Sequence, residues 1–296
     1  MRDARYGKRD TGCSNKIIVY KWHRSRIPYP ITRIQYPATT HTFAPMYTLK
    51  KSLGQHFLKD ENISRKIVDA LKEHPFERLL EVGPGGGALT KYLIELKDVD
   101  LKCVELDDEK VQWLIKTYPV LKDKIIPASF LDIPKPFEQE FTVVGNFPYN
   151  ISSQILFRIV DWKESVPHMI GMFQKEVAQR AVSKEGNKVY GVLSVLVQAF
   201  YKVEYLFEVH ENSFNPPPKV KSAVIRLARR TDVPAMKSER ALFTLVKAAF
   251  NQRRKTLRNA TRSLFNDTIL EDPIFQKRAE QLSVEQFCEL TFKMTQ

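Results

Sequence analysis

Short, nearly continuous apolar runs recur between residues 79 and 227, each bounded by glycine, proline or polar residues. Runs of this kind predict strands that are buried on both faces of a sheet. We expect strands at residues 79–82, 101–105, 124–127, 141–145, 168–173, 203–209 and 220–227. In the last range, Val220, Val224 and Leu227 supply the apolar positions.

Between these runs, apolar residues recur at helical spacing. Such stripes predict amphipathic helices at residues 63–71, 88–96, 107–118, 152–162 and 191–200, and a further helix from Lys175. Strands that alternate with helices predict an α/β fold built on a doubly wound sheet. Because no helix separates the last two strands, we expect them to form an antiparallel hairpin at the end of that sheet.

The end of the chain has a different pattern. A polar stretch at residues 228–237 is followed by a module of helical spacing too short for an α/β core of its own. Its first segment, 238–265, reads as one amphipathic helix with a single acid, Glu239. Its polar side carries seven bases: Arg240, Lys247, Arg253, Arg254, Lys255, Arg258 and Arg262. A charged run is usually only a solvated face, but this excess of bases favours contact with nucleic-acid phosphates.

These patterns predict one large and one small domain. We expect the larger domain at residues 46–230 and a small all-helical domain at residues 236–296. Residues 1–45 hold nine Lys/Arg against two Asp/Glu and show no sustained helical or strand period. We expect this segment to be a disordered extension, or to precede a natural start at Met46. A transit peptide is the alternative, while the lack of an apolar core argues against a secretory signal.

The composition is that of a globular protein, with 43% hydrophobic residues and a formal net charge of +13. A basic protein favours a polyanionic partner, although much of the excess charge lies in residues 1–45. No apolar stretch is long enough to span a bilayer. The three cysteines are far apart and lack the spacing of metal ligands, so we expect no metal and a reduced, cytosolic setting.

A glycine-rich loop, Gly83-Pro84-Gly85-Gly86-Gly87, follows the first predicted strand of the sheet. Glycines allow the backbone to approach a ligand, and the start of the following helix favours a negatively charged group. The next strand ends in an acid, Glu105, which is where a carboxylate can bind the ribose hydroxyls of a nucleoside cofactor. The loop and the acid together predict a nucleoside cofactor. The basic stretch 50–60, which contains Gly54 and His56, leads into the first helix and could lie across that site.

Asn146-Phe147-Pro148-Tyr149 follows the strand predicted at residues 141–145. The Asn146 carbonyl can accept a hydrogen bond from an exocyclic amine, Pro148 fixes the turn, and Tyr149 offers a face for a flipped base. The plainer interpretation is a strand-to-helix turn with Asn146 as its cap and Tyr149 in the core.

The choice of cofactor lies between NAD and S-adenosylmethionine. Nothing after Asn146 supplies a proton relay or a second substrate domain of the usual size for a dehydrogenase. S-adenosylmethionine explains the Asn-Phe-Pro-Tyr turn, because an adenine amine is a poor nucleophile unless carbonyl acceptors align its lone pair with the methyl group. The sequence therefore favours S-adenosylmethionine.

Five separated blocks resemble the KsgA family of ribosomal RNA adenine dimethyltransferases. They are residues 53–58 (LGQHFL), 81–85 (EVGPG), 105–107 (ELD), 146–152 (NFPYNIS) and 214–220 (FNPPPKV). The resemblance covers the chain from about Lys50 to its end. It implies a Rossmann-like methyltransferase domain followed by a small helical domain. It also implies S-adenosylmethionine-dependent dimethylation of N6 on two adjacent adenosines near the 3′ end of small-subunit ribosomal RNA, with the immature small ribosomal subunit as partner. We expect a monomer without membrane contact.

The resemblance also assigns residues to roles. It implies that catalysis rests on Asn146, Phe147, Pro148 and Tyr149, and that the cofactor is bound by His56, Leu58, Gly83, Gly85, Glu105, Ser129 and Asn146. It further implies that the substrate is contacted by Tyr149, Phe214, Arg253, Arg254 and Arg258.

Three positions depart from the common pattern of the family. Histidine stands at position 56 where many members have asparagine, and Phe147 replaces leucine or proline. Ser129 stands where an acid usually contacts the adenine of the cofactor, and Asp132 is the alternative for that contact. Two rival functions stay open: an Erm-type enzyme acting on large-subunit RNA, and a non-catalytic RNA-binding assembly factor.

Overall fold

The computed structural model describes residues 56–295, and the segment 1–45 lies outside this range. Its strands are β1 (Phe57–Leu58), β2 (Arg78–Val82), β3 (Asp100–Glu105), β4 (Ile125–Pro127), β5 (Thr142–Asn146), β6 (His168–Gln174), β7 (Tyr201–Val209), β8 (Phe214–Asn215) and β9 (Ser222–Arg229). Its α-helices are α1 (Glu61–Lys72), α2 (Thr90–Leu93), α3 (Asp108–Thr117), α4 (Ser152–Asp161), α5 (Lys175–Val182), α6 (Val192–Gln198), α7 (Glu239–Asn251), α8 (Leu257–Thr261) and α9 (Val284–Phe292).

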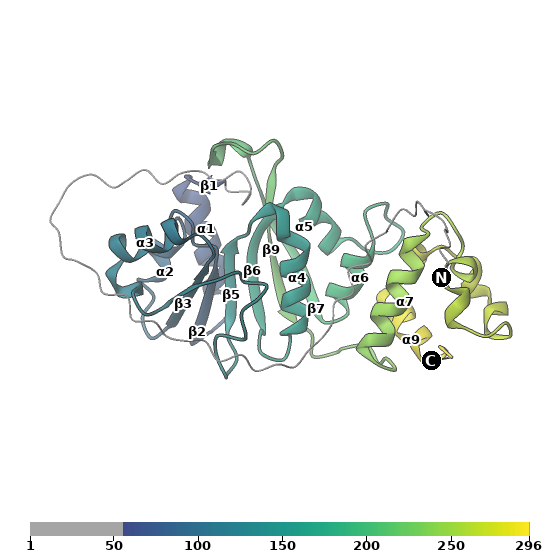
Figure 1. Cartoon of the computed structure of the whole chain (residues 1–296). Coiled ribbons are helices and arrows are strands. Elements are labelled where there is room, and N and C mark those ends of the chain that lie inside the picture. The colour runs from purple at the N-terminus through teal and green to yellow at the C-terminus, as the bar shows by residue number, and fades with distance from the viewer. Residues whose placement is uncertain (1–55, 296) are drawn as a thin grey trace, which may run out of the picture. The chain divides into compact units, whose positions relative to one another are not determined.

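Seven of the strands in the described part of the chain form one sheet, in the order β4-β3-β2-β5-β6-β9-β7 (Figure 1). The strands from β4 to β6 run parallel, whereas β9 is antiparallel to both of its neighbours. The α/β class and the antiparallel hairpin of the last two strands are therefore confirmed. The chain leaves β2 toward β3 and then crosses back to β5, so the order of strands reverses between β2 and β5. Ligands of open α/β sheets collect at such a point.

The sheet is covered on both faces because its central strands are apolar at successive positions. Leu80 and Val143 belong to a buried cluster that includes α4 and α6, whereas Leu79 and Val144 belong to a second cluster with α1. Neighbouring residues of one strand point to opposite faces, so each of these strands contributes to both clusters. A sheet buried in this way holds its carboxyl ends in fixed positions.

The C-terminal helices pack against the sheet domain through α6. Leu242 and Leu245 of α7 are fully buried in the same cluster as Leu196 of α6. Ser238 caps the N-terminus of α7, because its side chain accepts a hydrogen bond from the Ala241 backbone amide at 3.1 Å. The apolar cluster thus continues from the sheet into the helices, and the division at residues 230–236 stays a prediction.

The prediction of a single helix at residues 238–265 is wrong. The structure has α7, a turn, α8 and a short 3₁₀ segment, Arg262–Leu264. Had α7 continued, Arg253 would follow Ala249 and Phe250 at helical spacing and would enter the apolar face. The turn instead leaves Arg253 exposed, where its guanidinium donates to the Lys188 carbonyl.

Two other boundaries also differ from expectation. The helix expected at 88–96 is reduced to the four residues of α2, because residues 85–89 form turns and Gly87 has a φ of +76°. A residue with this φ cannot continue an α-helix. The last strand begins at Ser222 and not at Val220, which is exposed. The prolines before Val220 keep that segment outside the sheet.

A small second sheet joins two segments that are far apart in the sequence. β1 pairs with β8 in antiparallel register, with Leu58 opposite Phe214. β8 lies in the connection between β7 and β9, so that connection holds the residues before α1 against the sheet domain. Within residues 56–295, no helix has the length and apolar character needed to cross a membrane.

Candidate active site

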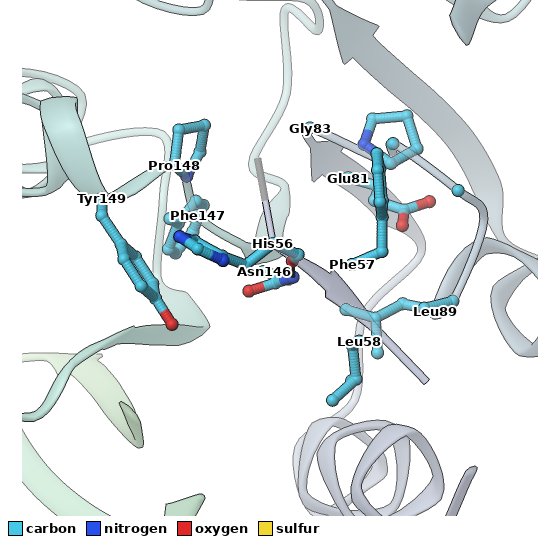
Figure 2. Close-up of a pocket in the computed structure, with 14 residues that line it drawn as sticks. His56, Phe57, Leu58, Glu81, Gly83, Leu89, Asn146, Phe147, Pro148 and Tyr149 are labelled. Carbon is cyan, nitrogen blue, oxygen red and sulfur yellow. Dashed lines mark hydrogen bonds between the residues drawn. The ribbon is translucent and has the colours of Figure 1, made fainter. Parts of the chain in front are cut away.

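A pocket opens at the carboxyl ends of β2 and β5, where the strand order reverses. It is lined by three segments: 56–58, the end of β2 with the loop after it, and 146–149. Figure 2 shows Tyr149, His56 and Asn146 on one side of the pocket, and Gly83 and Phe57 on the other. Three of the five blocks that carry the family resemblance, 53–58, 81–85 and 146–152, therefore contribute residues to one pocket.

The glycine loop is held in place by the acid at the end of β3. The Gly85 amide donates to Glu105 Oε2 at 3.0 Å, and the Asp107 amide donates to Oε1 at the same distance. Gly85 has a φ of +53°, and a Cβ there would lie 3.1 Å from the Phe57 ring. Glu105 is 8% exposed, and burial raises the pKa of its carboxyl. The two hydrogen bonds hold the Glu105 carboxylate at the edge of the glycine loop, at the strand end that the sequence predicts.

Asn146 ends β5 with its amide in a defined orientation. Its Nδ2 donates to the His56 backbone carbonyl at 3.1 Å. An amide that donates with its nitrogen presents its oxygen in the other direction. No described residue donates to that oxygen, so Oδ1 can accept a hydrogen bond from a ligand.

Tyr149 and His56 lie against each other. Their ring centroids are 5.3 Å apart with the planes inclined by 29°. The hydroxyl of Tyr149 hydrogen-bonds the Ser222 hydroxyl, and His56 Nδ1 donates to the Pro216 carbonyl at 3.0 Å. Both rings are thus fixed at their far ends, with Tyr149 tied to the first residue of β9. Tyr149 is not a plain core residue, since its half-buried ring lines the pocket.

Phe147 lines the pocket but packs against the sheet. It is 1% exposed, and a Cβ added to Gly171 of β6 would lie only 2.0 Å from its ring. Its amide donates to the Met172 carbonyl at 3.1 Å, so the residue also extends the pairing of β5 with β6. Phe147 therefore supports the turn from the sheet side, and its assignment to catalysis stays a prediction. Pro148, with a φ of −58°, connects the buried Phe147 to Tyr149.

Ser129 and Asp132, the two candidates for contact with the adenine, lie one turn apart in the loop after β4. The Ser129 hydroxyl accepts from the Leu131 amide at 3.2 Å, while its carbonyl accepts from the Asp132 amide at 3.0 Å. Asp132 is exposed. Neither residue lines the pocket around the glycine loop, so the structure leaves the choice between them open.

The residues expected to contact substrate fall into two groups. Phe214 is 1% exposed and packs in the cluster with α1, so its side chain is buried and its expected contact with substrate stays a prediction. By contrast, a basic segment lies in and just after the turn between α7 and α8. We use the name basic segment for its four exposed residues: Arg253, Arg254, Lys255 and Arg258.

Glu81 is a pocket residue for which the sequence predicts no catalytic or binding role. This residue of β2 lines the pocket although it is 1% exposed. Its Oε2 accepts from the Thr90 hydroxyl at 2.8 Å and from the Cys103 thiol at 3.7 Å. Burial raises the pKa of Glu81 to about 7. An acid inside an otherwise apolar strand was the signal that could have identified it. Among residues 56–295 no cluster of His, Cys, Asp and Glu suited to a metal ion occurs.

The fold and the pocket define the class of protein. The sheet has one antiparallel strand near its edge, and a glycine loop follows its central strand β2. An acid ends the neighbouring strand β3. Together these features are typical of a Rossmann-like methyltransferase. Solved structures share this fold. A dimethyladenosine transferase from Plasmodium falciparum has a TM-score of 0.65 at 24% identity, covering 79% of this chain and 96% of that one. A 23S rRNA methyltransferase, ErmE, has a TM-score of 0.64 at 22% identity, covering 81% of this chain and 100% of that one.

Sequence comparison identifies the family. The family described as "Ribosomal RNA adenine dimethylase" matches residues 46–296. The "Ribosomal RNA small subunit methyltransferase A" of Flavobacterium johnsoniae is 53% identical over 249 residues, covering 83% of this chain and 95% of that protein. The protein of the same name from Cytophaga hutchinsonii is 52% identical over 248 residues, covering 82% and 95%. The chain belongs to the ribosomal RNA adenine dimethylase family.

Proposed function

We propose that this protein transfers methyl groups from S-adenosylmethionine to N6 of two adjacent adenosines near the 3′ end of small-subunit ribosomal RNA. Relatives of about half identical sequence carry the name of a small-subunit methyltransferase, which favours this substrate over large-subunit RNA. The fold alone does not distinguish a small-subunit from a large-subunit RNA substrate, because the structure of an enzyme named for 23S rRNA is also similar to this chain.

The orientation of Asn146 is the observation that carries the proposal. Its nitrogen is engaged by the His56 carbonyl, so its oxygen is the atom that can receive an exocyclic amine. A hydrogen bond accepted from N6 would fix the amine and direct its lone pair. No strong base is needed before attack, because the proton can leave after the new bond has formed.

Residues in and beside the pocket support S-adenosylmethionine as the cofactor. We infer that Glu105 binds the ribose hydroxyls, that the Gly83–Gly85 backbone approaches the ligand, and that His56 and Leu58 form one wall. When bound, S-adenosylmethionine supplies a methyl group activated by a positively charged sulfur. The protein contributes alignment of the amine and exclusion of water.

Tyr149 is the residue that we assign to the target base. Aromatic faces hold extruded bases by stacking, and Ser222 keeps the ring in position. In the structure the His56 ring lies against Tyr149, and two rings whose centroids are 5.3 Å apart leave no room for a base between them. A base that stacks on this face would therefore displace the His56 ring.

The basic segment is the proposed RNA contact outside the pocket. Its four exposed cations follow α7, in the part of the chain that we assign to a small helical domain at residues 236–296. The charges contribute affinity for phosphates without reading the base sequence. We propose that this domain holds the subunit while the larger domain, residues 46–230, modifies the adenosines.

The proposal is tested with Asn146→Ala. We expect methyl incorporation into immature small subunits to fall nearly to zero, while S-adenosylmethionine still binds and the melting temperature changes little. The matched control is Asn62→Ala, which removes an exposed asparagine side chain from α1 and should retain activity. Wild-type turnover by a well-folded Asn146→Ala protein would contradict the role of the amide.

A non-catalytic RNA-binding factor is the second candidate, favoured by Ser129 in place of the usual acid. A titration of the wild-type protein with S-adenosylmethionine separates the two functions, because a factor that lost the reaction need not bind the cofactor. Ser129→Asp should tighten cofactor binding or leave it unchanged. A large loss of affinity would instead favour Asp132 as the residue beside the adenine.

A further inference from the structure

His56 contacts both of the residues that we assign to the target base. Its ring lies against Tyr149, with the centroids 5.3 Å apart, and its backbone carbonyl accepts from Asn146 Nδ2 at 3.1 Å. Figure 2 shows the His56 ring between the side chains of Tyr149 and Asn146. A base that stacks on Tyr149 and donates its amine to Asn146 Oδ1 needs the same space.

Two contacts hold the His56 ring in that space. One is the stack on Tyr149, in which the ring planes are inclined by 29°. The other is the hydrogen bond that Nδ1 donates to the Pro216 carbonyl at 3.0 Å. Aromatic pairs and hydrogen bonds of this kind each shift an equilibrium constant by roughly two- to tenfold. The ring is therefore a bound occupant of the base site, and a ligand has to compete with it.

The ring can leave without any movement of the backbone. The His56 carbonyl is held by Asn146, Leu58 pairs with Phe214, and the Lys59 amide donates to the Ser213 carbonyl at 2.9 Å. None of these contacts involves the imidazole. Rotation about the Cα–Cβ bond of His56 would free the face of Tyr149 and keep this wall of the pocket in place. Such rotamer changes are fast compared with the opening of a loop.

We propose that His56 is a gate on the target-base site. Its imidazole covers the face of Tyr149 in the free protein, and an adenine enters only by displacing it. This inference rests on the proposed function, because it takes Tyr149 and Asn146 to be the base site. The displaced ring gives up its stack and its bond to Pro216, so part of the binding energy of the base is used to open the gate.

A gate of this kind selects adenosines that belong to a bound RNA. Such an adenosine is delivered by phosphate contacts elsewhere on the protein, including those proposed for the basic segment, and these contacts offset the cost of displacing the ring. A free adenine nucleotide carries the same N6 amine but lacks those contacts. The gate therefore discriminates against free nucleotides without reading the sequence of the RNA.

The test uses adenosine 5′-monophosphate as the probe. The whole chain is first saturated with S-adenosylhomocysteine, so that the adenine of the probe does not enter the cofactor pocket, and binding of the probe is followed by NMR. We expect His56→Ala to bind the probe about fivefold or more tightly than wild type, because the site no longer has to be emptied. His210→Ala, at an exposed histidine, is the matched control and should bind it as wild type does.

Two further measurements connect the effect with the stack. Adding Tyr149→Ala to His56→Ala should abolish the gain, because the face on which the probe stacks is lost. In the free wild-type protein, the ring protons of His56 should show a chemical shift caused by the neighbouring Tyr149 ring, and this shift should disappear in Tyr149→Ala. Should His56→Ala fail to fold, His56→Asn keeps a polar side chain, removes the ring and should also tighten binding.

The outcomes separate a gate from a structural role. Loss of a merely structural side chain would weaken ligands, whereas loss of a gate strengthens binding of the probe. Unchanged or weaker binding of adenosine 5′-monophosphate in a folded His56 variant that retains its affinity for S-adenosylhomocysteine would overturn the gate and leave the methyltransferase function intact. A wild-type protein that does not bind S-adenosylhomocysteine would overturn the proposed function and the gate with it.

Discussion

Replacing Glu81 with glutamine should change how the stability of the ligand-free protein depends on pH. Burial raises the pKa of Glu81 in the folded state to about 7, from an ordinary value of 4.5. Between these values, the folded protein holds a proton that the unfolded chain has lost. The free energy of unfolding therefore falls as pH rises through this window and is constant above it.

The magnitude follows from the size of the shift. Each unit of pKa difference corresponds to about 1.4 kcal/mol, so the full window removes about 3 kcal/mol from wild-type stability by pH 8. Glutamine carries no proton to lose and can still accept from Thr90. We therefore expect Glu81→Gln to gain up to about 3 kcal/mol relative to wild type between pH 5 and pH 8.

Urea denaturation followed by tryptophan fluorescence measures this difference. Variant and wild type are compared at each pH. Burial raises the pKa of Asp161 to about 6, so this residue titrates in the same range. Its contribution to stability is the same in both proteins and drops out of the difference. Glu138→Gln, at an exposed acid, is the control and should follow the wild-type profile. Parallel profiles for Glu81→Gln and wild type would refute the buried, proton-holding state of this carboxyl.

Three further predictions concern the site and the RNA contact. Glu105→Ala should weaken S-adenosylmethionine at least about tenfold by calorimetry, since each charge-assisted hydrogen bond contributes roughly 1.5–3 kcal/mol; unchanged affinity would place the ribose elsewhere. Gly171→Ala should destabilise the fold by about 1–3 kcal/mol, because its Cβ would overlap the Phe147 ring, and adding Phe147→Leu should recover part of the melting temperature. Alanine at the three arginines of the basic segment should lower the slope of log affinity against log salt by about 0.7–0.9 per lost contact, with cofactor affinity unchanged; an unchanged slope would make the segment a solvated surface.

Elements that are continuous in the sequence were predictable. The apolar runs locate β2, β3 and β5 to within a residue, because strands covered on both faces need an uninterrupted apolar sequence. The same patterns place Glu105 and Asn146 at strand ends on one edge of the sheet. These positions follow from the alternation of strands and helices alone.

The remaining features depend on contacts between distant segments. The spacing places Arg253 on the face of Ala249 and Phe250, but the burial of that face depends on α6 and α9, so the break after α7 was missed. The burial of Phe214 requires the pairing of β1 with β8, across more than half of the described chain. The environment of Glu81 comes from Thr90 and Cys103, which tertiary structure alone brings together.

The pairing of β1 with β8 also has a consequence for the order of assembly. His56 and Leu58 are among the first residues of the described chain, yet their partners Pro216 and Phe214 follow the first strand of the terminal hairpin. Contacts of such sequence separation form late, because the intervening loop must first be closed. A nascent chain that has reached β6 already contains the glycine loop, Glu105 and Asn146, but one wall of its pocket still lacks its strand partner. The pocket is therefore completed only after most of the sheet has been synthesised.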